Sequence, residues 1–363
     1  MSERNLLILA VTASILIVLV ALFYSGLDFS RESFKSGTPL LQGLDPDKIS
    51  SITIKMGGET LTLRRSAEGF VIEEKGGYPA DTEKINDLLI DLLEIRLAEK
   101  TTESAANHDE LGVGEDSADA TLLFLNDLEG KQIAGIVKGK QVSRGSGSYI
   151  RLVEENTVYS TEKQFALDTN ATDYMNDELF ESLETEKITR VDVITSLGGY
   201  TLVREPAEGE DEEGRIVLLD IPPGKTADED ACSDVFEALD YLSFDDVRRA
   251  DEIQLAWDGT YRCTFESGLI YIIQSAKHDD KFYISLSAQP PAVDQITISP
   301  DEAEESLEEK EAILLAGDAA EAFNQRHAGW IYEVSDYDSE DLRKPLEELF
   351  EEEEEEESDE ADN

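Results

Sequence analysis

The stretch LDPDKISSITI, residues 44–54, is echoed far downstream by LETEKITRVDV, residues 183–193. Both begin with Leu, contain acidic residues and a Lys-Ile step, and end in alternating apolar residues. The echo continues in GGETLTLRRSAEG (57–69) and GGYTLVREPAEG (198–209), where the paired glycines predict a hairpin turn between two strands. Matches that recur in the same order indicate that the body of the chain was built twice from one plan.

A helix is predicted at the same place in each copy. ADTEKINDLLIDLLEIRL (80–97) parallels ADEDACSDVFEALDYLSF (227–244), and an Asp near the start of each stretch fits a helix N-cap. Apolar residues recur in both at intervals of three and four, which is the spacing of one helix face. They are Ile85, Leu88, Leu89, Leu92 and Ile95 in the first copy, and Cys232, Val235, Phe236, Leu239 and Leu242 in the second.

Strand patterns return after each predicted helix. They lie at 120–139 and 148–160 in the first copy, and at 260–277, 282–288 and 329–335 in the second. The order predicts an α+β fold with two tandem, similar strand-helix-strand domains, at 44–182 and 183–350. An acidic insertion near 289–327 interrupts the second domain. We expect it to be a solvated elaboration, with a peptide or cation site on it as the alternative.

An apolar run, LLILAVTASILIVLVALFY (6–24), predicts a transmembrane anchor close to the N-terminus. As a helix it would be about 28 Å long, close to the hydrocarbon thickness of a bilayer. A cleavable signal peptide is the competing interpretation, but its apolar region is usually shorter and ends in small residues. We therefore expect a stub and anchor over 1–24 and a tether over 25–43, in a single-pass membrane protein whose body lies outside the cytoplasm.

The chain is strongly acidic, with 82 Asp and Glu against 31 Lys and Arg, a formal net charge of −51. Such a surface repels the phosphates of nucleic acids, so DNA or RNA binding is disfavoured. The last residues, 351–363, are mostly acidic, and a run of Glu repels itself, which predicts a disordered tail. A dock for a basic partner is the alternative role of this tail.

No residue pattern marks a catalytic, cofactor-binding or metal-binding site. The sequence has no nucleophile-elbow motif, no HExxH motif and no CxxC pair. The stretch GKQVSRGSGSYI (139–150) lacks the residues of a phosphate-binding loop and lies between two strand patterns, which favours a hairpin. We therefore expect no enzyme activity, no cofactor and no metal.

The chain has two cysteines, Cys232 and Cys263. Cys232 takes the place of Ile85 on the apolar helix face, and Cys263 alternates with Tyr261 and Phe265 on a predicted strand. Two buried free thiols are the leading interpretation. A disulfide between helix and strand is the alternative, because an extracytoplasmic body would favour oxidation.

Several of these stretches together resemble one protein family. They are LDPDKISSITIKMGGETLTLRR, YPADTEKINDLLIDLLEIRLAEK, SYIRL, VYS and the closing GWIYEVSDYDSEDLRKPLEELF. The pattern resembles the bacterial membrane-anchored family called domain of unknown function 4340, over nearly all of residues 1–350. The resemblance implies a bacterial cell-envelope protein, so we expect the anchor to lie in the bacterial inner membrane. Members of the family are commonly encoded beside an ABC-type permease, an ATPase and an auxiliary protein of the gliding-motility type. It supplies no catalytic residues.

These observations lead to three hypotheses of decreasing weight. The first is a membrane-anchored, non-catalytic accessory protein associated with an ABC-type permease and ATPase complex. The second is a stand-alone envelope binding or scaffold module. The third is a hydrolase that acts on envelope material through an unrecognised carboxylate site.

Overall fold

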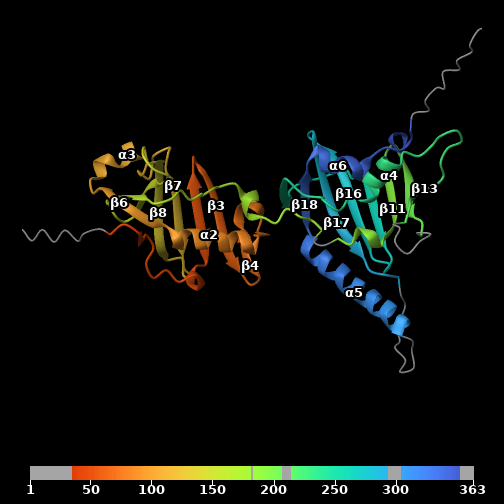
Figure 1. The fold of residues 1–363 in the computed structure, drawn as a ribbon, viewed down its shortest axis with the longest axis horizontal. Helices are drawn as coiled ribbons and strands as arrows, with labels where there is room; N and C mark the ends of the chain where they lie inside the picture. Colours follow the sequence, from red (N-terminus) through yellow and green to blue (C-terminus); the bar gives the residue numbers. More distant parts are fainter. Residues whose placement is uncertain (1–34, 181–182, 207–213, 293–303, 352–363) are drawn as a thin grey trace, which may run out of the picture. The chain divides into compact units, whose positions relative to one another are not determined.

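The structure, a computed structural model, describes residues 35–180, 183–206, 214–292 and 304–351. These residues form two large antiparallel sheets (Figure 1). The predicted α+β class with strand-helix-strand domains was therefore wrong, since the protein is mostly β. The physical reason is that most successive strands are joined by tight turns and pair antiparallel in hairpins. Few helices are therefore needed to connect the strands.

The first sheet has ten strands in the spatial order β1-β6-β10-β9-β8-β7-β2-β3-β4-β5. Their bounds are β1 (Thr38–Pro39), β2 (Ser51–Met56), β3 (Glu59–Ser66), β4 (Gly69–Ile72), β5 (Tyr78–Pro79), β6 (Arg96–Thr102), β7 (Thr121–Asn126), β8 (Gln132–Gln141), β9 (Ser148–Leu152) and β10 (Val158–Thr161).

The second sheet has eight strands in the order β13-β12-β11-β15-β16-β17-β18-β14. Their bounds are β11 (Ile188–Thr195), β12 (Gly198–Arg204), β13 (Ile216–Leu218), β14 (Asp246–Arg249), β15 (Gly259–Phe265), β16 (Ile270–His278), β17 (Lys281–Gln289) and β18 (Trp330–Val334). This order matches that of β4-β3-β2-β7-β8-β9-β10-β6 in the first sheet, strand for strand along the chain. The parallels between the two halves of the sequence thus have a counterpart in the strand order.

Five α-helices lie within the described residues: α2 (Thr82–Glu94), α3 (His108–Leu111), α4 (Glu229–Phe236), α5 (Glu304–His327) and α6 (Asp336–Arg343). The predicted N-caps are confirmed for α2 and α4. Asp81 accepts hydrogen bonds from the backbone of Glu83 and Lys84, and Asp228 accepts one from Ala231. All ten apolar residues assigned to these two helix faces are buried, although α4 ends at Phe236, earlier than the pattern indicated.

The chain divides into two compact units. One comprises the described parts of Met1–Ile49, Ile54–Glu59 and Leu89–Leu167, and the other those of Ser50–Thr53, Thr60–Leu88 and Asp168–Asn363. The first has a core cluster of Val113, Ala120, Val137 and Val158. In the second, the ring of Tyr78 meets those of Phe244, Trp330 and Tyr332 edge to face, at centroid distances of 5.1–6.3 Å.

No helix within the described residues is long and apolar enough to cross a membrane. The predicted anchor at 6–24 lies outside the described residues, and so does the acidic tail from residue 352 onward.

Candidate functional site

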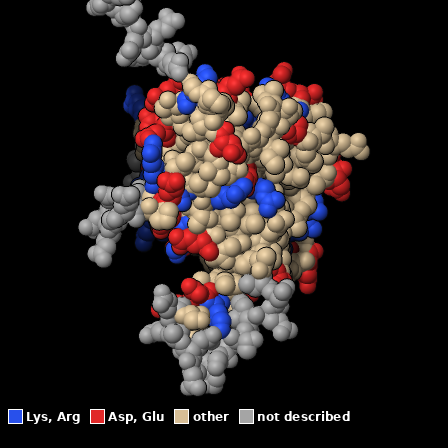
Figure 2. Space-filling view, turned by 90° about the vertical axis from the view of Figure 1, so that its right-hand side faces the viewer, with Lys and Arg blue, Asp and Glu red and all other residues tan. Residues whose placement is uncertain are grey.

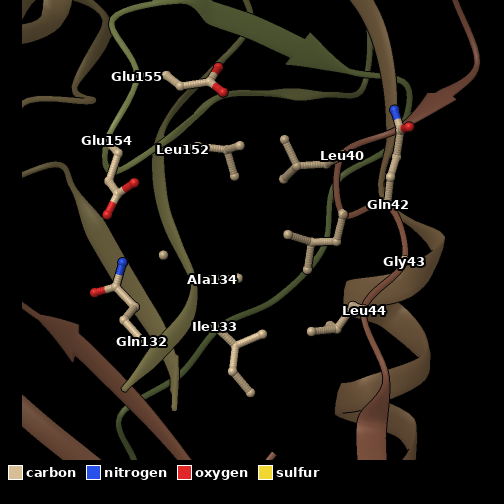
Figure 3. Close-up of a pocket in the computed structure, with 12 residues that line it drawn as sticks. Leu40, Gln42, Gly43, Leu44, Gln132, Ile133, Ala134, Leu152, Glu154 and Glu155 are labelled. Atoms are coloured by element: carbon tan, nitrogen blue, oxygen red, sulfur yellow. The ribbon is translucent and has the colours of Figure 1, made fainter. Parts of the chain in front are cut away.

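The candidate site of the first unit is a cleft of about 520 Å³ between residues 40–44 and the β8–β9 hairpin. Figure 3 shows Leu40 pointing toward Leu152 across the opening, with Leu44 on the side of Leu40 and Ile133 below. The walls are therefore aliphatic. The polar groups that line the cleft come from Gln42, Gln132, Glu154 and Glu155.

One wall is fixed by a short strand that precedes it. Thr38 and Pro39 form β1 and pair with Leu97 and Arg96 of β6. The backbone N–H of Leu40 then donates to the carbonyl of Ile95 at 3.0 Å. These bonds hold residues 38–40, which lie in the stretch predicted as a tether, against the sheet. Leu40 and Leu41 are buried as a result.

The opposite wall is the start of β8, where Gly135 allows a close approach of two chain segments. The amide of Val153 donates to the carbonyl of Gly135 at 2.9 Å. A Cβ atom at Gly135 would lie 2.8 Å from a methyl group of Val153 and 2.8 Å from the side-chain nitrogen of Gln132. A side chain at this position would therefore force Gln132 and Val153 to shift, so glycine allows the close approach.

The rim of the cleft is held in place by Arg151, which is only 4% exposed. Its Nε donates to the carbonyl of Val113 at 2.8 Å, and one terminal nitrogen donates to the carbonyls of Leu152 and Val153 at 3.1 and 2.9 Å. The other terminal nitrogen forms an ion pair with Glu115 at 3.1 Å. A buried guanidinium with this many acceptors ties the segment that carries Glu154 and Glu155 to the core of the unit.

The arrangement suits a particular kind of ligand. In Figure 3 Glu154 and Gln132 lie on the far side of Ala134 from Leu40 and Leu44, and Glu155 lies above Leu152. Both carboxylates are exposed. An aliphatic opening edged by exposed acids favours an apolar segment that carries positive charge at its boundary. Within the described residues no three His, Cys, Asp or Glu side chains are grouped to hold a metal ion.

The cysteines singled out in the sequence lie in the second unit. Cys232 on α4 and Cys263 on β15 are both buried and are free thiols in the structure. Burial raises the pKa of Cys232 to about 11 and also raises the pKa of Cys263. A disulfide between them stays a prediction that thiol counting can test.

The cleft and its supporting arginine were missed by sequence reasoning. Its walls are residues 40–44 and 132–155, far apart in the chain, and no local pattern joins them. One signal was present, because Arg151 interrupts the apolar stretch SYIRL, and an arginine in a strand with buried neighbours needs internal acceptors.

Comparison with known families then places the chain. A family model described as "Domain of unknown function (DUF4340)" matches residues 71–256, about half of the chain. The chain belongs to this family. The DUF4340 match begins within β4 and ends after β14, so it spans strands of both sheets and includes the β8–β9 wall of the cleft. The resemblance inferred from the sequence is confirmed. A search of curated proteins found no match to the chain.

Proposed function

We propose that the protein is a single-pass, non-catalytic accessory protein of the bacterial cell envelope that associates with an ABC-type permease and ATPase. Its body lies outside the cytoplasm, and its cleft receives an apolar segment of a membrane partner. The observation that carries this proposal is the place of the cleft in the chain. One wall, residues 40–44, follows the apolar run 6–24 after only a short connecting segment.

The length of that connection limits how far the cleft can lie from the anchor. Residues 25–39 can extend at most about 50 Å, at roughly 3.3–3.6 Å per residue. A cleft on such a connection would remain near the membrane surface. A partner embedded in the same membrane would therefore meet it at a high effective concentration.

The chemistry of the cleft supports a binding role. Leu40, Leu41, Leu44, Ile133 and Leu152 line it, and apolar area of this kind gains about 25 cal/mol per Å² when a partner covers it. Long Lys and Arg side chains near the ends of membrane-spanning helices extend to the bilayer interface. The carboxylates of Glu154 and Glu155 would complement such a boundary.

Site-specific crosslinking in native membranes tests the proposal. A photo-crosslinking amino acid replaces Ile133, which lines the cleft and is 38% exposed. The matched control replaces Leu128, which is 88% exposed on the turn before the same strand and lies outside the cleft. We expect an adduct with a permease subunit, identified by mass spectrometry, from position 133 and not from position 128.

Other outcomes separate the alternatives. An adduct from position 133 with an envelope protein unrelated to transport would favour the stand-alone binding module. Affinity purification from native membranes is a second test. If the protein is recovered alone, in a detergent that preserves known ABC complexes, the transport assignment is overturned. Reporter enzymes fused to the C-terminus test the orientation. If a reporter that works only in the cytoplasm is active and one that works only in the periplasm is not, the proposed orientation is overturned.

A further inference from the structure

A second opening, which we call the α5 groove, lies in the second unit. It has a volume of about 720 Å³ and runs between α5 and the turn that joins β15 to β16. The strand side contributes Phe265, Leu269 and Tyr271, and the helix side contributes Ala312, Ile313, Leu315, Ala316 and Ala319. A smaller hollow of about 200 Å³ shares Leu183, Tyr271 and Ala319 with it, so the opening continues along the helix.

The groove exists because α5 is fastened to the sheet mainly through its C-terminal half. Phe323 packs on Tyr271 with ring centroids 4.6 Å apart, and Ala320 is buried. Farther toward the N-terminus of the helix, over residues 306–315, no side chain is fully buried. Figure 1 shows this end of α5 extending beyond the strands of the second sheet. A helix attached at one end leaves an open channel along the other.

The groove exposes apolar side chains to water. Leu315 lines it and is 60% exposed, and Ile313 beside it is only partly buried. The α5 residues that line the groove are spaced three and four apart, so they form one stripe along the helix. A partner helix with an apolar stripe would fill such a channel, which is a common way in which proteins recognise amphipathic helices.

The charges around the groove indicate the character of that helix. Glu184 is paired with Lys187 at 2.7 Å and, together with the nearby charges of Glu186 and Glu266, raises the pKa of that lysine. Glu309, on the helix side of the groove, forms no ion pair within the described residues. Figure 2 shows acidic residues spread over one face of the molecule among uncharged side chains and some bases, so the acidity is not confined to the tail. With a net charge of −51, a second copy of the chain would be repelled and a basic segment attracted.

We propose that the α5 groove binds a basic amphipathic helix of a partner protein. The apolar stripe of that helix covers Ile313 and Leu315, and its Lys or Arg residues face Glu266 and Glu309. This inference is independent of the transport assignment, because it rests on residues of the second unit alone. It assigns a binding role to the acidic insertion, which the sequence favoured as a solvated elaboration.

The test uses full-length protein in nanodiscs of neutral lipid and a fluorescein-labelled Leu/Lys peptide designed as an amphipathic helix. Fluorescence anisotropy measures its binding, with empty nanodiscs as the background. A peptide of the same composition in scrambled order controls for charge alone. We expect the amphipathic peptide to bind at least about tenfold more tightly than the scrambled one, because only it presents an apolar stripe.

Two matched pairs of variants locate the site. Leu315→Asn should weaken binding about five- to tenfold, and Leu314→Asn, at a residue that is 50% exposed but outside the groove, should not. Glu309→Gln should weaken it about two- to threefold more than Glu308→Gln, which removes the same charge from an exposed site outside the groove. All four positions are exposed, so the variants should remain folded.

Three results would overturn the proposal. Equal binding of the amphipathic and scrambled peptides would reduce the interaction to general attraction by an acidic protein. Equal effects within each pair of variants would place the binding elsewhere. Self-association of the protein that Leu315→Asn abolishes and Leu314→Asn does not would assign the α5 groove to a second copy of the chain.

Discussion

The side-chain amide of Asn324 binds both backbone groups of Ala288. Its Oδ1 accepts from the amide of Ala288 at 2.8 Å, and its Nδ2 donates to the carbonyl of the same residue at 2.8 Å. Asn324 lies on α5 and Ala288 on β17. The helix therefore supplies the hydrogen bonds that a neighbouring strand would otherwise give to Ala288. These two bonds add to the packing of Phe323 on Tyr271 in attaching the inserted helix to the second sheet.

The substitution Asn324→Leu should lower the free energy of unfolding by about 2–4 kcal/mol. It leaves a buried amide and a buried carbonyl of Ala288 without partners, and each such group costs about 1–3 kcal/mol. Urea denaturation measures the loss, and hydrogen exchange at Ala288 should become faster. The control Gln325→Leu alters an exposed neighbour and should change stability by less than about 0.5 kcal/mol. Equal effects of the two substitutions would contradict this role of Asn324.

Replacing Arg151 by Met should cost about 3 kcal/mol or more. The substitution removes hydrogen bonds to Val113, Leu152 and Val153 and leaves their carbonyls without this donor. The rim segment of the cleft should then be cut sooner by protease. The matched control is Arg144→Met, at an exposed residue in the turn between β8 and β9, and it should have little effect on stability. A protease pattern that Arg151→Met leaves unchanged would show that the rim does not depend on this side chain.

Both cysteines should resist alkylation in the native protein. A rise in the pKa of Cys232 from 9.0 to about 11 reduces its thiolate about 100-fold at pH 8, and only the thiolate reacts. Burial of Cys263 acts in the same direction. Iodoacetamide labelling followed by mass spectrometry should therefore be slow until denaturant is added. Two thiols should then react without reductant, and the absence of both would establish the disulfide.

Stability should fall in mild acid partly because of His327. Burial, and to a lesser extent the charge of Arg326, lowers the pKa of His327 from 6.5 to about 3, while its Nδ1 lies 2.7 Å from the hydroxyl of Tyr332. Between pH 6.5 and 3 only the unfolded chain takes up this proton. Protonation therefore stabilises the unfolded state relative to the folded state. The contribution is absent above pH 6.5 and reaches about 2 kcal/mol of lost stability at pH 5.

The variant His327→Asn tests this contribution because asparagine cannot titrate and can still offer a hydrogen-bond partner near Nδ1. Urea midpoints at pH 7 and pH 5 should differ less for the variant than for the unaltered protein, by about 2 kcal/mol after conversion. If both proteins lose the same stability between these pH values, the imidazole is not responsible.

Local features of the fold were predictable from the sequence to a useful degree. The apolar spacing of Ile85 to Ile95 identified a helix and its buried face, and Asp81 and Asp228 were found as caps. Such features depend on residues within one or two turns of each other. The stretch 139–150 was likewise predicted as a hairpin, and β8 and β9 pair antiparallel there.

The class of the fold and the cleft depend on contacts that no short pattern encodes. The spacing in 227–244 indicated a long helix, but α4 ends at Phe236, and Leu239 and Leu242 are buried without it. Burial alone cannot tell a helix from the turns that follow it. The cleft needs β1 to pair with β6, which brings Leu40 opposite a hairpin about ninety residues away.

The bond between Asn324 and Ala288 also bears on contacts between molecules. β17 pairs with β18 only from Phe282 to Ile284, so the remainder of that strand edge has no strand beside it among the described residues. An open edge of this kind is a template for adding strands from other chains. Because Asn324 of α5 bonds both backbone groups of Ala288, α5 covers part of this edge, and we expect it to hinder the addition of strands from other chains. Deletion of α5 should therefore reduce solubility in addition to removing the helix side of the α5 groove.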